Sequence, residues 1–400
     1  MTKVEGVISM GAKSANPQSY ELIKKLISYD TTSRDSNLDL IGFVQDYLAD
    51  LGVESTLIHD ETGQKANLYA TLGPKDRSGF MLSGHTDVVP VDGQPWDTDP
   101  FHVSDSNGKL YGRGTADMKS FLAIVLALAP EFLKRGPQVP IHLAFSYDEE
   151  VGCIGARGLV EMLKAQEHRP YACVVGEPTS MKPVRAHKGQ KRICCRVRGL
   201  ESHSALPDRG VNAVEAAAEV IAFLKTMARR IRDEGPHDPD FDPPYTTVHT
   251  GTVKGGTALN IVPKECSFEF EFRYLPSDDP EVLYREVLEH AENNILPEML
   301  AVSEATGFDW EELTGIPSLA IKEDTELAQL TMALTGSNRT GTVAFGTEAG
   351  LFQNTDIPTI VCGPGDIEQA HKPNEFITLD QVAEGEVFMR RLMDRICASA

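Results

Sequence analysis

The sequence is poor in features that would point to a partner of strong negative charge. Only 7% of its 400 residues are aromatic, and 38 basic residues face 59 acidic ones, which leaves a formal net charge of -21. A nucleic acid or an anionic membrane would be repelled by this excess, so neither is expected as a partner. A protein with this balance can instead favour small cationic molecules.

Long hydrophobic runs are also missing. The longest apolar run, FLAIVLALA at residues 121–129, is far shorter than the roughly 20 residues that a membrane-spanning helix needs. Residues 1–20 lack the continuous apolar segment of a secretory signal. We therefore expect a cytoplasmic protein without a membrane partner.

The number and spacing of the cysteines argue against a disulfide-stabilised fold and against a metal site with cysteine ligands. The chain has seven cysteines, an odd number, with no Cys-x-x-Cys spacing, and Cys194 and Cys195 are adjacent. This pattern is typical of reduced thiols in a cytosolic protein. It predicts neither a disulfide framework nor a thiolate metal site.

What the sequence does contain is an alternation of helical and strand patterns, which indicates an α/β fold with helices flanking a central sheet. Helical periodicity covers residues 19–30 and 39–52. Short apolar runs that end in turn residues predict strands at 66–73, 79–84, 139–148 and 171–178.

The pattern changes near residue 189. From there we predict a strand, a helix (212–231), two strands (246–256 and 265–276), a helix (279–295) and a final strand around 298–307. This β-α-β-β-α-β order is that of a ferredoxin-like domain. We therefore predict a discontinuous α/β domain, residues 1–188 and 314–400, into which residues 189–313 are inserted as a second domain.

Histidines and carboxylates follow four of the apolar runs. His85 and Asp87 follow the run at 79–84, Glu149 and Glu150 follow the run at 139–148, and Glu177 lies near the end of the run at 171–178. Ligands of open α/β sheets bind outside the carboxyl ends of the strands, so these side chains should meet at one edge.

Two more side chains join this set. His371 comes a short loop after the apolar run IPTIVCG, and Asp117 lies in the Gly-rich turn YGRGTADMKS. Imidazole and carboxylate donors without thiolate suit Zn²⁺, Co²⁺ or Mn²⁺, and the set is too large for one tetrahedral ion but serves two. Adjacent Glu149 and Glu150 can divide the tasks of base and ligand, and Asp87 can orient the imidazole of His85.

At these residues the sequence resembles the M20 family of dinuclear-zinc peptidases and deacylases. The pieces SGHTDVVP, YGRGTADMK, SYDEEVG, GEPT, GLESHSALPDRGVNA and AHKPNE occur in the order found in that family, and they span nearly the whole chain. The resemblance implies that His85 and Glu177 hold one metal ion, that Glu150 and His371 hold the other, and that Asp117 bridges them. Glu149 would be the general base, and the two ions would be Zn²⁺, or Co²⁺ in its place.

The resemblance also gives roles to residues of the inserted domain. From the residues alone, His203 is a loop histidine and Arg273 an exposed strand residue. By resemblance, His203 would help to hold the oxygen of the tetrahedral intermediate, Arg273 would bind the α-carboxylate of the substrate, and Asn260 would assist. The inserted domain would act as a lid and join two copies into a homodimer, with His203 reaching the active site of the neighbouring subunit.

The implied activity is hydrolysis of a small N-acyl amino acid. Segment 346–376 resembles the deacetylases of the family more than its desuccinylases. A cationic substrate side chain would need an acidic partner, for which Glu348 is the candidate. Other activities of the family stay open at this point, namely desuccinylase, aminoacylase and carboxypeptidase. A second alternative is that the protein binds a ligand in a metal-dependent way and has no catalytic activity.

Overall fold

The computed structural model describes residues 15–397 and divides the chain into two compact units. The first unit contains the chain up to Pro183, Glu323–Thr340 and the chain from Thr355 onward; the second contains Val184–Lys322 and Gly341–Asn354. The predicted insertion, residues 189–313, lies inside the second unit. Most of the stretch that was predicted to lack a secretory signal, residues 1–14, lies outside the described residues.

The first unit is built on a mixed sheet in which strands occur in the order β1-β2-β6-β3-β7-β17. The strands are β1 (Ser55–His59), β2 (Ala66–Leu72), β3 (Phe80–His85), β6 (Ile141–Ser146), β7 (Ala172–Pro178) and β17 (Thr359–Gly363). β1, β2 and β6 pair antiparallel, whereas β6, β3, β7 and β17 run parallel. The carboxyl ends of these four parallel strands therefore lie at one edge.

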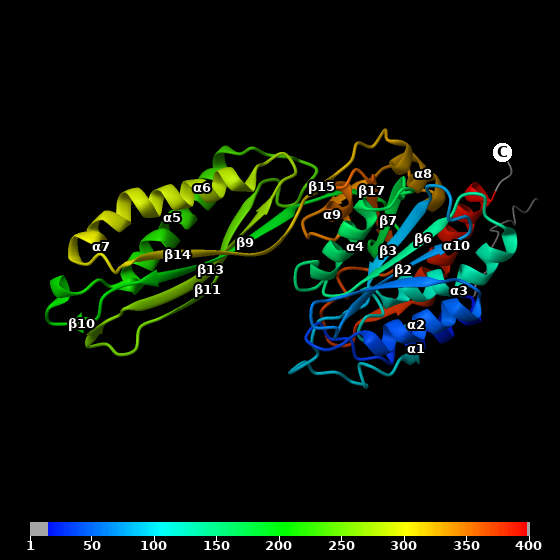
Figure 1. The fold of residues 1–400 in the computed structure, drawn as a ribbon, viewed down its shortest axis with the longest axis horizontal. Helices are drawn as coiled ribbons and strands as arrows, with labels where there is room; N and C mark the ends of the chain where they lie inside the picture. Colours follow the sequence, from blue (N-terminus) through cyan, green and yellow to red (C-terminus); the bar gives the residue numbers. More distant parts are fainter. Residues whose placement is uncertain (1–14, 398–400) are drawn as a thin grey trace, which may run out of the picture. The chain divides into compact units, whose positions relative to one another are not determined.

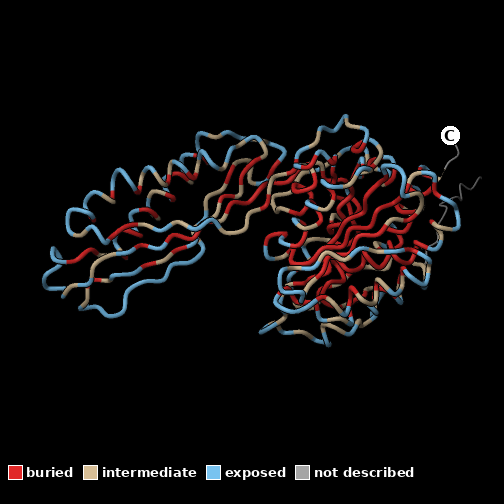
Figure 2. The backbone as a smooth tube through the Cα atoms, viewed as in Figure 1, coloured by how far each residue is buried: buried red, intermediate tan, exposed pale blue. Residues whose placement is uncertain are grey.

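Helices cover this sheet, as the α/β prediction requires (Figure 1). They are α1 (Pro17–Ile27), α2 (Leu38–Asp50), α3 (Lys119–Arg135), α4 (Ile154–Lys164), α8 (Glu326–Thr335) and α10 (Leu379–Ile396). A small sheet joins β4 (Ser104–Ser106), β5 (Lys109–Tyr111) and β18 (Phe376–Thr378). The apolar run at 121–129 is the buried part of α3, and strands β3, β6 and β7 are buried along their whole length (Figure 2). The predicted fold class is confirmed.

The second unit contains a four-stranded antiparallel sheet in the order β11-β13-β9-β14. Along the chain its elements are β9 (Gly189–Arg198), α5 (Ala213–Glu234), β11 (Thr247–Gly255), β13 (Glu265–Tyr274), α6 (Pro280–His290) and β14 (Gly307–Ile316). This is the β-α-β-β-α-β order. Phe268, Phe270 and Phe272 alternate along β13 and pack into one buried core with residues of both helices.

Shorter elements complete the second unit. They are β8 (Val184–His187), β10 (Ser202–His203), η1 (Pro207–Arg209), β12 (Ile261–Val262), η2 (Ala291–Ile295), α7 (Leu296–Val302), β15 (Leu319–Ala320), β16 (Gly341–Val343) and α9 (Ala349–Gln353).

One predicted strand was wrong. Most of residues 298–307 belong to α7 and the turn after it, and the strand is β14, which starts at Gly307. Pro297 does not stop the helix because it lies at the start of α7 directly after the π-helical segment η2, where the regular i→i−4 hydrogen-bond pattern is already interrupted. The alternation in β14 is visible at Phe308 and Trp310, which both pack against the core.

No disulfide joins the seven cysteines, all of which lie among the described residues. None of the described helices combines the length and the apolar character that crossing a bilayer requires.

Candidate metal centre

Six predicted ligand or base residues lie in the first unit, at the carboxyl edge of its parallel strands. His85 is the last residue of β3, Glu177 is the second-last residue of β7, and Glu149 and Glu150 follow β6. Asp117 lies just before α3, and His371 lies in the loop between β17 and β18. The side chain of His371 is about half exposed (52%), whereas the other five side chains are buried.

Asp117 lies between the two histidines. Its Oδ1 is 3.0 Å from Nε2 of His85, and its Oδ2 is 3.4 Å from Nε2 of His371. Nε2 of His371 is also 3.1 Å from Oε2 of Glu150. One carboxylate thus presents an oxygen to each histidine, which is the arrangement that a bridging ligand between two positions requires.

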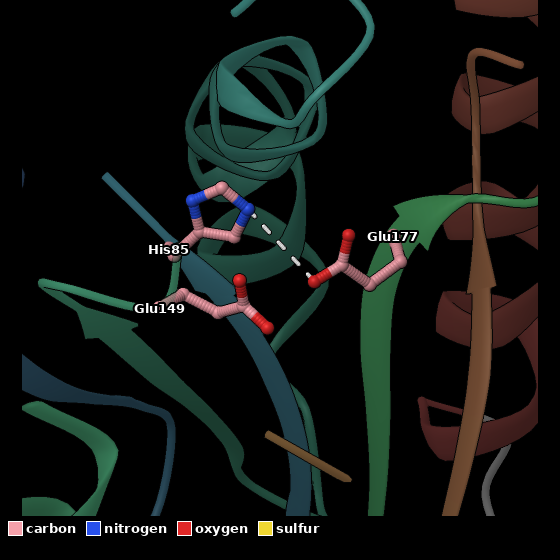
Figure 3. Close-up of side chains that lie close together, drawn as sticks. All are labelled: His85, Glu149 and Glu177. Atoms are coloured by element: carbon pink, nitrogen blue, oxygen red, sulfur yellow. Dashed lines mark ion pairs between the residues drawn. The ribbon is translucent and has the colours of Figure 1, made fainter. Parts of the chain in front are cut away.

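A second group of donors surrounds His85. Figure 3 shows the side chains of His85, Glu149 and Glu177 pointing toward one another from β3, from the turn after β6 and from β7. Each offers a ligand atom within 4.8 Å of the others, and Nε2 of His85 is 3.8 Å from Oε1 of Glu177. His85, Asp117 and Glu150 form another group of this kind.

The electrostatics of the cluster show that carboxylates crowd a buried space. Burial raises the pKa of Glu149 to about 8 and that of Glu150 to about 7, and the charge of Asp117 adds to both shifts. Burial and Asp117 likewise raise the pKa of Glu177 well above its usual range. Burial would raise the pKa of Asp117 too, but hydrogen bonds from His371 and His85 hold it below its usual value.

This environment fits divalent cations. Oε1 of Glu177 is buried and has no hydrogen-bond partner among the described residues, although such atoms are nearly always paired. A cation would supply the missing partner and offset the repulsion between the carboxylates. Two imidazoles and several carboxylates, without thiolate, are donors for ions such as Zn²⁺, Co²⁺ or Mn²⁺.

Asp87 supports the cluster in a way that the sequence did not predict. The nearest partner of His85 Nδ1 is the main-chain carbonyl of Asp87, at 2.9 Å, while the Asp87 carboxylate is 3.5 Å away. That carboxylate accepts hydrogen bonds from Ser33 Oγ (2.7 Å) and from the main-chain N–H groups of Glu149 (3.0 Å) and Glu150 (3.3 Å). Asp87 therefore fixes the backbone of both glutamates as well as lying beside the imidazole.

Glu375 is a further residue that sequence reasoning did not single out. It is buried, and its carboxylate accepts a hydrogen bond from the main-chain N–H of Asp117 at 3.1 Å. The only signal in the sequence was its position in AHKPNEF, four residues after His371.

The other four predicted site residues belong to the second unit. His203 and Asn260 are brought together there: His203 ends β10, Asn260 directly precedes its partner strand β12, and the Asn260 carbonyl accepts from Ser204 N at 3.1 Å. Arg273 lies on β13 with its Nε 3.1 Å from Glu271 Oε1. Glu348 is buried directly before α9. Their roles at the metal centre stay predictions.

Comparison with known proteins gives consistent results. The sequence profile of "Peptidase family M20/M25/M40" matches residues 81–395. The chain is 33% identical over 380 residues to an acetylornithine deacetylase of Pasteurella multocida, which covers 92% of this chain and 94% of that protein.

Solved structures share the fold at lower sequence identity. The aminopeptidase PepT from Bacillus cereus aligns with a TM-score of 0.73 and 21% identity, over 96% of this chain and all of that one. The Bacillus subtilis YXEP protein, described as a dinuclear metal binding peptidase of the M20 family, aligns with a TM-score of 0.65 and 15% identity, over 94% and 96% of the two chains.

Proposed function

This chain belongs to peptidase family M20/M25/M40 and is a hydrolase of linear amides, and we propose that its substrate is N2-acetyl-L-ornithine, which it cleaves to acetate and L-ornithine in arginine biosynthesis. The observation that supports this substrate most is the similarity to an acetylornithine deacetylase over 92% of the chain. A biosynthetic role of this kind would place the protein in the cytoplasm.

We assign two divalent ions, Zn²⁺ or Co²⁺, to the cluster in the first unit. His85 and Glu177 would hold one ion and Glu150 and His371 the other, and Asp117 would contact both. The separate contacts of the two Asp117 oxygens with the two histidines support this division. When bound, such ions acidify the attacking water and stabilise the negative charge that develops on the amide oxygen.

The side chains of this protein would supply the remaining chemistry. Glu149 would take a proton from the attacking water and return it to the leaving amine, which departs as the free amino group of ornithine. The Arg273 guanidinium would bind the α-carboxylate with two parallel N–H donors, and Asn260 would assist. Glu348 would pair with the cationic end of the ornithine side chain.

The substrate assignment can be tested with a panel of N-acyl amino acids and peptides assayed with metal-loaded enzyme. We expect kcat/KM to be highest for N2-acetyl-L-ornithine. A clearly higher value for N-succinyl-diaminopimelate, for another acetylated amino acid or for a peptide would replace the proposed substrate by that compound, while leaving the hydrolase assignment in place.

Burial of the acidic side chains, together with their mutual repulsion, predicts how metal binding changes the stability of the protein with pH. Raised pKa values at Glu149 (about 8) and Glu150 (about 7) mean that the folded metal-free protein holds protons that the unfolded chain, near 4.5, has released. This contribution to the free energy of unfolding is lost as pH rises through these values. His371 acts in the same direction, because its pKa is raised from 6.5 to about 10 by its hydrogen bonds to Asp117 and Glu150.

The melting temperatures of metal-free and metal-loaded protein should therefore diverge between about pH 6.5 and about pH 8. The measurement is the difference in melting temperature between the two forms, determined by calorimetry at each pH. Groups that titrate elsewhere in the chain affect both forms equally and do not contribute to this difference. A difference that stays constant or narrows over this range would contradict the assignment of these side chains to the metal centre.

We also propose a homodimer formed through the second unit. β11 is one of the two edge strands of the four-stranded sheet, and an edge strand offers its main-chain groups to a further strand. Val253 on this strand is 60% exposed, and Leu259 after it is fully exposed. A second copy would cover these apolar side chains.

In such a dimer, His203 would act in the active site of the partner subunit. His203→Ala should lower kcat by about 10²- to 10³-fold, as loss of one oxyanion donor does, with both metals retained. Mixing this variant with Glu149→Ala creates one site with both residues intact, so part of the activity should return. Absence of recovery, despite subunit exchange shown with two affinity tags, would place His203 in the site of its own subunit.

A further inference from the structure

A buried carboxylate holds the backbone of the turn that carries Asp117. Oε1 of Glu375 accepts hydrogen bonds from three main-chain N–H groups, those of Gly114 (3.1 Å), Ala116 (2.8 Å) and Asp117 (3.1 Å). Oε2 of Glu375 accepts from Nη1 of Arg113 at 2.7 Å. Both side chains of this ion pair are only 1% exposed.

The same arginine leads to the loop that carries His371. Nη2 of Arg113 donates to Oε1 of Gln94 at 2.6 Å, and Nε2 of Gln94 donates to the main-chain carbonyl of His371 at 3.0 Å. Nη1 of Arg113 also contacts the carbonyl of Lys372 at 3.3 Å. A continuous path of hydrogen bonds therefore joins the backbone of Asp117 to the backbone of His371.

His371 needs such support because of its own conformation. Its φ of 63° lies in the left-handed region, which residues other than glycine rarely adopt and which is retained only where surrounding contacts fix it. A buried ion pair adds little net stability, because removing two charges from water is costly. The position of this pair beneath two loops that each carry a candidate ligand suggests another role.

We propose that Glu375 is a positioning residue, which acts with Arg113 and Gln94 to hold Asp117 and His371 at the separation that one metal ion requires. This inference rests on the proposed dinuclear centre, since both residues are assigned there to the ion held by Glu150. Residues that hydrogen-bond to a metal ligand, without contacting the metal ion themselves, commonly change metal affinity by about 10- to 100-fold. The effect should be larger at the metal position of His371, because the path holds both Asp117 and the His371 loop there, and smaller at the position of His85 and Glu177, which shares only Asp117.

The test is metal titration of the metal-free Glu375→Gln protein. This change keeps the size of the side chain but turns an amide N–H₂ group toward the donors of Arg113. Titration with Co²⁺, followed by visible absorption and calorimetry, should show one ion bound about 10- to 100-fold more weakly and the other ion weakened clearly less. Binding of both ions with unchanged affinity by folded Glu375→Gln protein would overturn the proposal.

Glu386→Gln is a matched control. Glu386 is also buried, accepts a main-chain N–H (Asn16, 2.8 Å) and pairs with an arginine (Arg390, 3.4 Å), but these partners are not candidate ligands. The Glu386→Gln variant should have a lower free energy of unfolding but an unchanged metal affinity. If it weakened metal binding as much as Glu375→Gln, the effect would be one of general stability and the proposal would fail.

A second variant keeps the proposal testable if Glu375→Gln does not fold. Gln94 is half-buried, so Gln94→Ala should fold and should still weaken the metal position of His371, by about 10-fold. Gln138, an exposed glutamine of the same unit, serves as its control. Unchanged affinity in Gln94→Ala would overturn the link to His371, whereas failure of the unchanged protein to bind two ions would overturn the proposed function itself.

Discussion

Removal of the metal ions should lower the rate of amide hydrolysis by several orders of magnitude, and Zn²⁺ or Co²⁺ should restore it. The reason is that bound ions would supply the acidified water and the positive charge at the developing oxyanion, which the described cluster of acidic side chains cannot replace. The measurement is the hydrolysis rate before chelation, after chelation and after titration with each ion, together with the metal content at each step.

A variant of Asp117, the proposed bridging residue, makes this test specific to the site. Asp117→Ala removes the carboxylate whose two oxygens face His85 and His371, so it should weaken binding at both positions and abolish activity. Asp394→Ala removes an exposed carboxylate of the same unit, on α10, and should change neither. Equal rates before and after chelation, or a fully active Asp117→Ala protein, would exclude metal-dependent catalysis.

The sequence predicted much of the first unit because its signals are local. The strands before His85, Glu149 and Glu177 are short apolar runs, and parallel pairing brings their carboxyl ends to one edge whatever the details of packing. The residue type at each strand end could therefore be placed in space without knowing the loops. Distances between the side chains, such as the 3.0 Å between His85 and Asp117, are not available from such reasoning.

Long-range hydrogen bonds explain most of what was missed. Asp87 binds the main chain of Glu149, 62 residues away, and Glu375 binds that of Asp117, 258 residues away. Every residue except proline has a main-chain N–H, so the sequence does not show which N–H group a carboxylate binds. An acidic residue that makes such a contact therefore looks like any other acidic residue. Only the family motif AHKPNE set Glu375 apart, and it did not indicate a role.

The misplaced strand of the second unit has a different cause. Propensity suggested a strand around 298–307, but α6 continues through η2 into α7, and Pro297 lies at the start of α7, where it is tolerated. The pairing of β14 with β9 then fixes the strand at Gly307–Ile316. Tertiary pairing, rather than local preference, decided this boundary.

Glu149→Gln should lower kcat by about 10²- to 10⁴-fold while both metal ions stay bound, because Glu149 is proposed as the general base, and a general base contributes a factor of this size without being a ligand. Glu149 is buried, and burial raises its pKa to about 8. The positive charge of bound ions would lower this pKa, so that the ionised form needed to accept a proton is present near neutral pH. The measurement is kcat and KM alongside the metal content of the purified variant.

Glu150→Gln is the matched comparison, because it changes the neighbouring residue in the same way. Glu150 lies 3.1 Å from His371, so its variant should weaken one metal position and lose activity for that reason, with partial recovery at high metal concentration. The geometry also admits the opposite assignment, since Glu149 offers a ligand atom to the group that contains His85 and Glu177. If Glu149→Gln lost a metal ion and Glu150→Gln kept both, Glu149 would be a ligand and Glu150 the base. The two variants therefore decide between the assignments by metal content, which does not depend on knowing the substrate.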